Sequence, residues 1–373
     1  MHNISEQLYR KASRNKIPHD GTFDLSPICN FKFKMCYVRQ TQEQIGASGK
    51  RLRTWEEWLQ LARKCKEAGM LYLLLTGGEP FLYPDFKKLY LELHKMGLLI
   101  SINTNGTMIN EKVLEWLKEY PPHRVNITLY GIADETYERV CGNGKSCEKV
   151  KNAIRLLKEV GIGVVINASM IPENAEDLKG IIEYGKANGI PTRVSTYMFP
   201  PARREREERD SRLSPEESAR IYMEKYRCYM ESEELHKYIT YKLSTVKCDD
   251  ERSQKGCDIR RDGNMRCRAG RSTFWVSWEG TMTACGMMPF PIEEHPFEND
   301  FYECWMELTN KVRDSKVLSE CVNCAKKEIC EPCAAILYSE TGTTDEKAPY
   351  LCKLSECIIK EMKEEMTFAN RKE

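Results

Sequence analysis

The 373-residue chain lacks three features that would assign it to common classes of protein. No run of apolar residues approaches the ~20 that a transmembrane helix needs. Residues 1–16 are polar, so no secretory or transit signal is expected. No charge of one sign is in excess, since 57 Lys and Arg residues face 56 Asp and Glu. We therefore expect a cytoplasmic protein that binds neither a membrane nor nucleic acid.

Cysteine, by contrast, is abundant, with 17 residues. In a reducing compartment, thiols at short and fixed spacings indicate metal binding or catalysis rather than disulfides. The densest series lies near the carboxyl end and comprises Cys267, Cys285, Cys321, Cys324, Cys330, Cys333 and Cys352. Because C-x2-C pairs suit tetrahedral zinc as well as iron–sulfur clusters, zinc is the alternative metal.

Six short β-type runs alternate with helix-type segments in the first two thirds of the chain. The helical pattern is clear over residues 54–68, where Trp58, Leu59 and Ala62 share one face. Repeated strand–helix units predict parallel strands covered by helices, in an α/β fold. Periodicity alone leaves a doubly wound sheet and an incomplete barrel both open. The predicted strands are 21–28, 71–76, 99–103, 125–129, 163–168 and 193–197.

Unusual residues follow several of these predicted strands directly. Cys29 follows the first, Gly77-Gly78-Glu79 the second and Asn105 the third. Because α/β folds gather their active sites at the carboxyl ends of their strands, these residues are expected at one site.

The alternating pattern breaks at two prolines and a dense mixed-charge stretch, residues 200–210. Ser214-Pro215 then predicts a helix start, with Ser as N-cap and Pro at the first helical position. We expect an amino-terminal extension (1–21), a barrel core (22–199), a charged linker and bridging helix (200–250) and a cysteine-rich domain ending in a helix (251–373).

The motif Cys29-x6-Cys36 after the first strand, together with Thr76-Gly-Gly-Glu-Pro80 after the second, resembles the radical S-adenosylmethionine (radical SAM) superfamily. Its C-x3-C-x2-C signature binds a 4Fe-4S cluster whose open iron takes SAM. The resemblance implies a partial (β/α)6 TIM-like barrel followed by a small iron–sulfur domain. In this chain the middle cysteine of the signature is Phe33.

Phe33 matters because a phenyl ring offers no ligand atom and four-iron clusters are held by thiolates. Three interpretations follow. The substitution inactivates a working enzyme, the chain has become a non-catalytic binder, or a remote thiol such as Cys65 supplies the ligand. A buried core cysteine is the simpler interpretation of Cys65, which lies on the apolar face of its predicted helix.

The carboxy-terminal cysteines resemble the SPASM extension of radical SAM enzymes, which carries two auxiliary 4Fe-4S clusters. By that resemblance, one set of thiols holds an outer cluster and another an inner one, with Cys257 as a candidate fourth ligand of the inner set. The outer set is Cys321, Cys324, Cys330 and Cys352, and the inner set is Cys267, Cys285 and Cys333.

The resemblance also implies a set of SAM-binding residues. The Gly-Gly-Glu turn would meet the methionine end of SAM, and residues at later strand ends would reach its other parts. These residues are Gly77, Gly78, Glu79, Asn103, Asn105, Thr128, Asn167, Met35 and Tyr37.

SPASM members mostly modify peptides or proteins, so the resemblance implies a SAM-dependent maturase with a flavodoxin or ferredoxin as reductant. The residues before the first strand are too few for a folded leader-binding domain, so a separate leader-peptide-binding protein is expected. An anaerobic sulfatase-maturating type is disfavoured, because such enzymes carry aspartate where Gly286 follows Cys285. A silent iron–sulfur homologue and a zinc-stabilised binding protein are the other interpretations.

Overall fold

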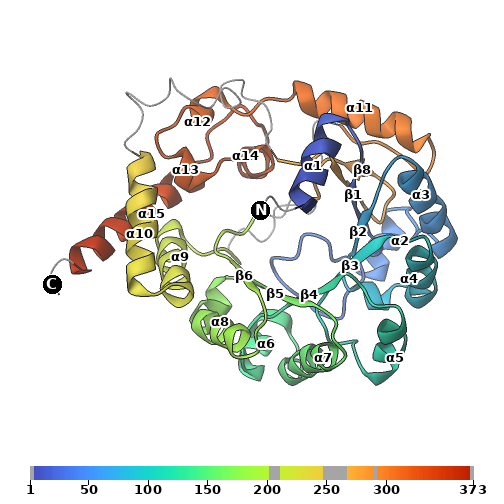
Figure 1. Cartoon of the computed structure of the whole chain (residues 1–373), viewed down its shortest axis with the longest axis horizontal. Coiled ribbons are helices and arrows are strands. Elements are labelled where there is room, and N and C mark those ends of the chain that lie inside the picture. The colour runs from blue at the N-terminus through green and yellow to red at the C-terminus, as the bar shows by residue number, and fades with distance from the viewer. Residues whose placement is uncertain (1–3, 201–210, 247–266, 289–291, 370–373) are drawn as a thin grey trace. The chain divides into compact units, whose positions relative to one another are not determined.

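The fold is built on one eight-stranded sheet. The structure is a computed structural model that describes residues 4–200, 211–246, 267–288 and 292–369. The strand order is β6-β5-β4-β3-β2-β1-β7-β8 (Figure 1). Strands β1 to β6 form the predicted partial (β/α)6 barrel, which excludes the doubly wound alternative. The strands are β1 (Asp20–Asp24), β2 (Tyr72–Thr76), β3 (Leu99–Thr104), β4 (Arg124–Thr128), β5 (Val164–Ser169), β6 (Thr192–Ser195), β7 (Thr273–Val276) and β8 (Met282–Thr283).

The helices follow the strands as the alternating pattern predicts. Within the described residues, none of them is long and apolar enough to cross a membrane. They are α1 (Ile4–Arg14), α2 (Gln42–Ala47), α3 (Trp55–Glu67), α4 (Phe86–Lys95), α5 (Glu111–Glu119), α6 (Asp134–Cys141), α7 (Cys147–Glu159), α8 (Leu178–Ala187), α9 (Pro215–Tyr229), α10 (Ser232–Val246), α11 (Phe301–Asp314), α12 (Ser319–Val322), α13 (Lys327–Cys330), α14 (Ala334–Thr341) and α15 (Pro349–Ala369).

Strand β1 shows how the two faces of the sheet differ. Phe23 is fully buried on the outer face, where its ring lies 4.9 Å from that of Trp58 in α3. Because side chains alternate along a strand, Asp20 and Thr22 face the inside of the barrel. Helix α3 begins at the N-cap Thr54 with a full capping box. The outer face is thus an apolar core under helices, while the inner face carries polar groups.

Strand β1 ends at Asp24, four residues earlier than the pattern predicted. The next residues bond to the Gly-Gly-Glu turn rather than continuing a ladder: the Gly78 N–H donates to the Ser26 carbonyl at 2.6 Å, and the Glu79 N–H to that of Ile28 at 2.9 Å. The other five predicted strands agree with the observed ones to within one or two residues at each end.

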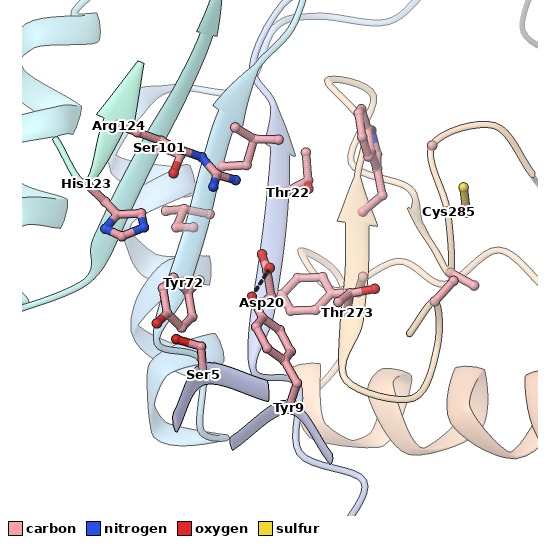
Figure 2. A pocket seen from close by; sticks show the side chains of 17 residues that line it. Ser5, Tyr9, Asp20, Thr22, Tyr72, Ser101, His123, Arg124, Thr273 and Cys285 are labelled. Atoms are coloured by element: carbon pink, nitrogen blue, oxygen red, sulfur yellow. Dashed lines mark hydrogen bonds between the residues drawn. The ribbon is translucent and has the colours of Figure 1, made fainter. Parts of the chain in front are cut away.

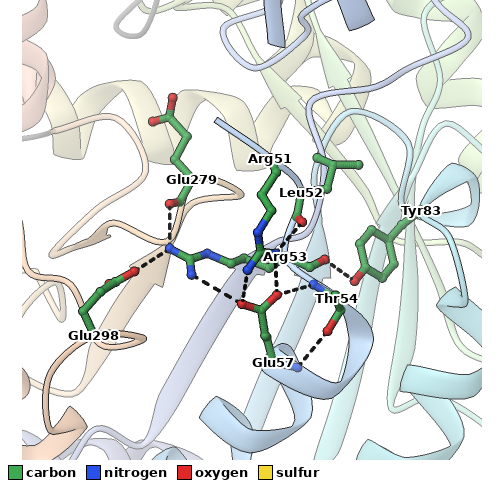
Figure 3. Close-up of polar contacts among 8 residues, drawn as sticks. All are labelled: Arg51, Leu52, Arg53, Thr54, Glu57, Tyr83, Glu279 and Glu298. Carbon is green, nitrogen blue, oxygen red and sulfur yellow. Dashed lines mark hydrogen bonds and ion pairs between the residues drawn. The ribbon is translucent and has the colours of Figure 1, made fainter. Parts of the chain in front are cut away.

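The described residues from 267 to 315 pack with the barrel core, which the sequence pattern did not indicate. Strand β7 pairs in parallel with β1, and Arg53 adds a second attachment. Its guanidinium contacts Glu298 at 2.6 Å and Glu57 at 3.5 Å, and donates to the Glu279 carbonyl (Figure 3). Since Glu298 is half exposed, the pairing of β7 contributes more to this attachment than the ion pair does.

Close contacts divide the chain into two compact units. The first comprises residues 1–129, 133–167 and 266–315, and the second comprises 130–132, 168–265 and 316–373. The second unit has its own apolar core, where Met223 of α9, Ile239 of α10 and Met362 of α15 are fully buried together. Helix α9 begins at the predicted N-cap Ser214, which forms a full capping box with Glu217. This unit therefore contains its own stabilising core.

Candidate functional site

The cysteine loop runs from the end of β1 to α2. The Phe31 N–H points at the Cys29 sulfur (3.4 Å) and the Arg39 N–H at the Cys36 sulfur (3.3 Å). Burial raises the pKa of the Cys29 thiol to about 12, and the nearby Glu79 and Cys36 add to that rise. The loop therefore brings two of the predicted thiols near each other.

Phe33 occupies the middle position of the signature and belongs to an aromatic cluster. Its ring lies 5.4 Å from that of Phe31, which in turn lies 6.2 Å from the ring of Tyr137 in α6. Phe31 is fully buried and Phe33 is only 9% exposed. The loop thus offers two thiols and an apolar ring, which does not fit a cluster held by three thiolates.

The Gly-Gly-Glu turn fixes the cysteine loop through close backbone contact. Gly77 has φ +146°, and a Cβ there would lie 2.5 Å from the Ser26 carbonyl oxygen. A Cβ on Gly78 would collide with the Ile28 carbonyl oxygen. Only glycine allows these two backbones to approach so closely. The two glycines therefore place the loop that begins with Cys29.

The Glu79 carboxyl group is fully buried and ties β2 to β3. It accepts hydrogen bonds from the Thr104 hydroxyl at 2.8 Å and from the N–H groups of Asn105 (2.8 Å) and Phe81 (3.2 Å). Burial raises its pKa to about 7, although these hydrogen bonds oppose the rise. Glu79 therefore orders the carboxyl ends of two strands, in the place predicted for SAM contact.

Asn105 connects the end of β3 to the cysteine loop. Its Nδ2 donates to Asn30 Oδ1 at 2.8 Å and lies 3.8 Å from the Cys29 sulfur. Asn30 Nδ2 in turn donates to Thr107 Oγ1 at 2.9 Å. Two segments that are about 75 residues apart in sequence are thus joined around Cys29.

The other predicted SAM-binding residues lie in or near this part of the first unit. Asn103 Oδ1 accepts from Asn126 Nδ2 at 2.7 Å, and Thr128 is the register partner of Asn167. Both members of the Thr128–Asn167 pair are partly exposed, at the carboxyl ends of β4 and β5. In the cysteine loop, Met35 is buried and Tyr37 is partly buried. The inner face of the strands therefore presents polar side chains at its carboxyl end.

The predicted outer-cluster cysteines gather in the second unit. Burial raises the pKa of the Cys330 thiol to about 12, and the nearby thiols of Cys352, Cys321 and Cys324 add to the rise. Four thiols that lie this close fit the donor set of a four-thiolate cluster. Among the described residues, no three Cys, His, Asp or Glu side chains are arranged to hold a metal ion, so these thiols lie near one another without forming a closed site.

The predicted inner set is described only in part. Cys267 and Cys285 belong to the first unit and Cys333 to the second. Cys257 and the charged stretch 201–210 lie outside the described residues. Gly286 lies against the indole of Trp275, and a Cβ there would lie 2.7 Å from that ring. The Trp275 indole therefore leaves room only for glycine at the position after Cys285.

A polar row on the inner face of the barrel was not predicted from the sequence. Thr22 of β1, Ser101 of β3 and Arg124 of β4 line a cavity in the first unit (Figure 2). Alternation of polar and apolar residues along β1 and β4 was a signal for it. Strand register was needed to show that the three residues converge.

Replacing Gly78 with alanine should destabilise the protein by about 1–3 kcal/mol, because the new methyl group must displace the Ile28 backbone. The iron bound by the Phe33→Cys form should fall as well when Gly78→Ala is added to it. Gly46→Ala is the matched control: no atom lies within 4 Å of a Cβ there, and alanine in α2 should stabilise by up to about 1 kcal/mol. Denaturant unfolding measures both, and equal effects would contradict the close-contact account.

Comparison with known proteins agrees with this geometry. The model of the Radical SAM superfamily matches residues 24–185. The chain is 27% identical to AdoMet-dependent heme synthase of Methanosarcina barkeri, over 76% of this chain and 82% of that protein. It is 26% identical to the antilisterial bacteriocin subtilosin biosynthesis protein AlbA of Bacillus subtilis, over 51% of this chain and 44% of AlbA.

A solved structure shares the fold. Streptococcus suis SuiB bound to the precursor peptide SuiA superposes with a TM-score of 0.65 at 18% identity, covering 94% of this chain and 82% of SuiB. The family match includes the loop of Cys29 and the Gly77–Glu79 turn, whose backbones are joined. The chain therefore contains a domain of the radical SAM superfamily, followed by a cysteine-rich carboxy-terminal region.

Proposed function

We propose that the chain derives from a radical SAM oxidoreductase that modifies a peptide or protein, of the type that matures ribosomally made peptides. The observation that carries this proposal is the turn Gly77–Glu79, which holds the Cys29 loop at the carboxyl end of a partial barrel. Peptide chemistry is supported by relatives such as AlbA, a bacteriocin biosynthesis protein. In this class the cofactor supplies the radical chemistry, and the barrel binds the substrate and excludes water.

We infer that Phe33 impairs this form of the protein. The loop has two thiols where the signature has three, and its middle position is occupied by an apolar ring packed on Phe31. A silent homologue is the alternative, one that binds peptide or transfers electrons through auxiliary clusters. The impaired enzyme and the silent homologue are distinguished by the Phe33→Cys variant, which restores the missing thiol and should restore SAM cleavage only in the former.

The cysteine-rich region would serve as a SPASM-type extension. The gathering of Cys321, Cys324, Cys330 and Cys352 supports an outer auxiliary cluster. The inner cluster, with Cys267, Cys285 and Cys333, is a proposal from the resemblance alone. A flavodoxin or ferredoxin would supply electrons, and a separate protein would present the leader peptide.

A tetrapyrrole is the second candidate substrate. The match to AdoMet-dependent heme synthase extends over 82% of that protein, whereas the chain spans less than half of AlbA.

A sulfatase-maturating activity is less well supported. The aspartate that those enzymes carry after the matching cysteine would collide here with the Trp275 indole at Gly286.

Product analysis tests the proposal. Anaerobically reconstituted protein, in the Phe33→Cys form, is incubated with SAM, reductant and candidate precursor peptides, and the peptides are then analysed by mass spectrometry. A SAM-dependent mass change confined to a peptide is expected. A change in a propionate-bearing iron porphyrin, with all peptides unchanged, would transfer the assignment to tetrapyrrole chemistry.

A further inference from the structure

A cavity of about 440 Å³ lies in the first unit, on the inner face of the strands and toward their amino ends (Figure 2). It is lined by Tyr9 of α1, by residues of β1 to β4 and β7, and by Cys285 and Gly286. Small-molecule sites commonly range over about 300–1,000 Å³. The cavity can therefore hold a side chain together with the peptide backbone around it.

Strand register places the polar residues of this cavity in one row. Arg124 pairs with Ser101, Ser101 with Leu74, and Leu74 with Thr22. Thr22 also pairs with Trp275 of β7. Five neighbouring strands thus contribute one residue each at the same level of the barrel. Since side chains at one level point to the same face, the guanidinium and two hydroxyls converge.

The donors in this row have no partner in the described part of the chain. The Nε atom of Arg124 is buried without a hydrogen bond, and its guanidinium forms no ion pair there. The side-chain hydroxyls of Ser101 and Thr22 make no hydrogen bond among the described residues either. A buried donor left unsatisfied is unfavourable, and more so when it is charged. A ligand with acceptor oxygens would remove that cost.

Asp20 is the acidic group that faces this row, and it is engaged elsewhere. It accepts a hydrogen bond from the Tyr9 hydroxyl at 2.7 Å, and burial raises its pKa. The neighbouring rings of Tyr72 and His123 contact each other at 5.8 Å between centroids. The positive charge of Arg124 opposes the rise in the pKa of Asp20, so it acts on Asp20 at a distance, but no ion pair joins the two among the described residues and the guanidinium can still bind a ligand.

We propose that this cavity binds a carboxylate of the substrate peptide, from an aspartate or glutamate side chain, and that Arg124 selects for it. Arginine presents two parallel N–H groups that match a carboxylate, and Ser101 and Thr22 add hydroxyl donors. The proposal rests on the proposed peptide-modifying function and deepens it by naming a substrate feature.

The distance from Arg124 to the predicted SAM-binding end of the barrel determines how far the bound acidic residue lies from the modified residue. Arg124 and Thr128 are four residues apart on β4, which is about 13 Å along a strand. An extended peptide covers that distance with about four residues. The acidic residue is therefore an anchor about four positions from the residue that is modified.

The test measures binding of two probes to iron-loaded protein by ligand-observed NMR. The probes are acetylated, amidated tripeptides, Ala-Glu-Ala and its uncharged equivalent Ala-Gln-Ala. The glutamate probe should bind at least tenfold more tightly than the glutamine probe. Arg124→Met should abolish that preference, and Arg124→Lys should retain part of it. Arg155→Met, which removes an exposed arginine of α7 in the same unit, should leave it unchanged.

Equal binding of both probes to the unaltered protein would overturn the proposal, as would no binding of either at about 10 mM. A preference that survives in Arg124→Met, shown by circular dichroism to be folded, would also overturn it. The measurement needs no SAM cleavage. A glutamate preference lost in Arg124→Met therefore supports the site even if no peptide product forms, in which case only the proposed function fails.

Discussion

The Phe33→Cys variant should bind about four more iron atoms per chain than the unaltered protein and should gain SAM cleavage from a near-zero baseline. The reason is geometric. Cys29 and Cys36 already lie near each other in a loop held by the Gly77–Glu79 turn, so a thiol at position 33 completes the set of three. Iron and sulfide content, EPR with and without SAM, and release of 5'-deoxyadenosine measure the gain.

The same substitution should weaken the protein before iron is added. Removing the Phe33 ring breaks its contact with Phe31, and losing a buried ring costs up to about 3 kcal/mol. Phe33→Ser is the matched control, because it removes the ring and adds a hydroxyl group, which binds iron less tightly than a thiolate does. If Phe33→Ser gains as much iron as Phe33→Cys, or if Phe33→Cys makes no 5'-deoxyadenosine under strong reductant, the missing-ligand account is wrong.

The structure also suggests which thiol to test if the unaltered protein already holds a SAM-responsive cluster. Cys65 is fully buried in α3, and burial raises its pKa well above the usual value. Cys141, at the end of α6, lies near enough to Cys29 for that thiol to raise its pKa, after the larger effect of burial. In that case Cys141→Ser should abolish the signal and Cys65→Ser should not.

Replacing Cys324 with alanine should remove the iron of the outer cluster and lower the melting temperature of the iron-loaded protein by about 10 °C. The four thiols lie on α12, α13 and α15 and on the segment between α12 and α13. Ile329, next to Cys330, and Leu354, two residues after Cys352, belong to the apolar core of the second unit. A cluster at these thiols would therefore link helices of that core.

Cys357→Ala is the control for this change. Cys357 lies on the same helix as Cys352 and is 9% exposed within the apolar core, so its loss affects packing and not metal binding. Calorimetry and iron analysis on both variants separate the two effects. Unchanged iron and melting in Cys324→Ala would remove Cys324 from the set of ligands.

Local rules predicted much of the fold. The helix that begins at Ser214 was recognisable from its N-cap serine and from Pro215, and the helix over residues 54–68 was recognisable from its apolar face. The six barrel strands followed from their alternation with helices. Strand β7 was missed, since four residues in a cysteine-rich stretch carry too little pattern, and its pairing with β1 spans some 250 residues.

The sequence indicated which residues belong to the site, but not which of them contact one another. The pairing of Glu79 with Thr104, and of Asn105 with the Cys29 loop, depends on which strands are neighbours. The row of Arg124, Ser101 and Thr22 depends in addition on strand register. The periodicity of a single segment contains neither the order of the strands nor their register, which explains why the inner cavity was not predicted.

The contact between Gly286 and Trp275 also bears on how such a protein can change over generations. An acidic residue after Cys285 has no room while the indole is present, because even a methyl group would lie 2.7 Å from the ring. Position 275 must first acquire a smaller side chain. The two positions are therefore epistatic, so a lineage or a directed-evolution experiment can gain a carboxylate there only through an ordered pair of mutations.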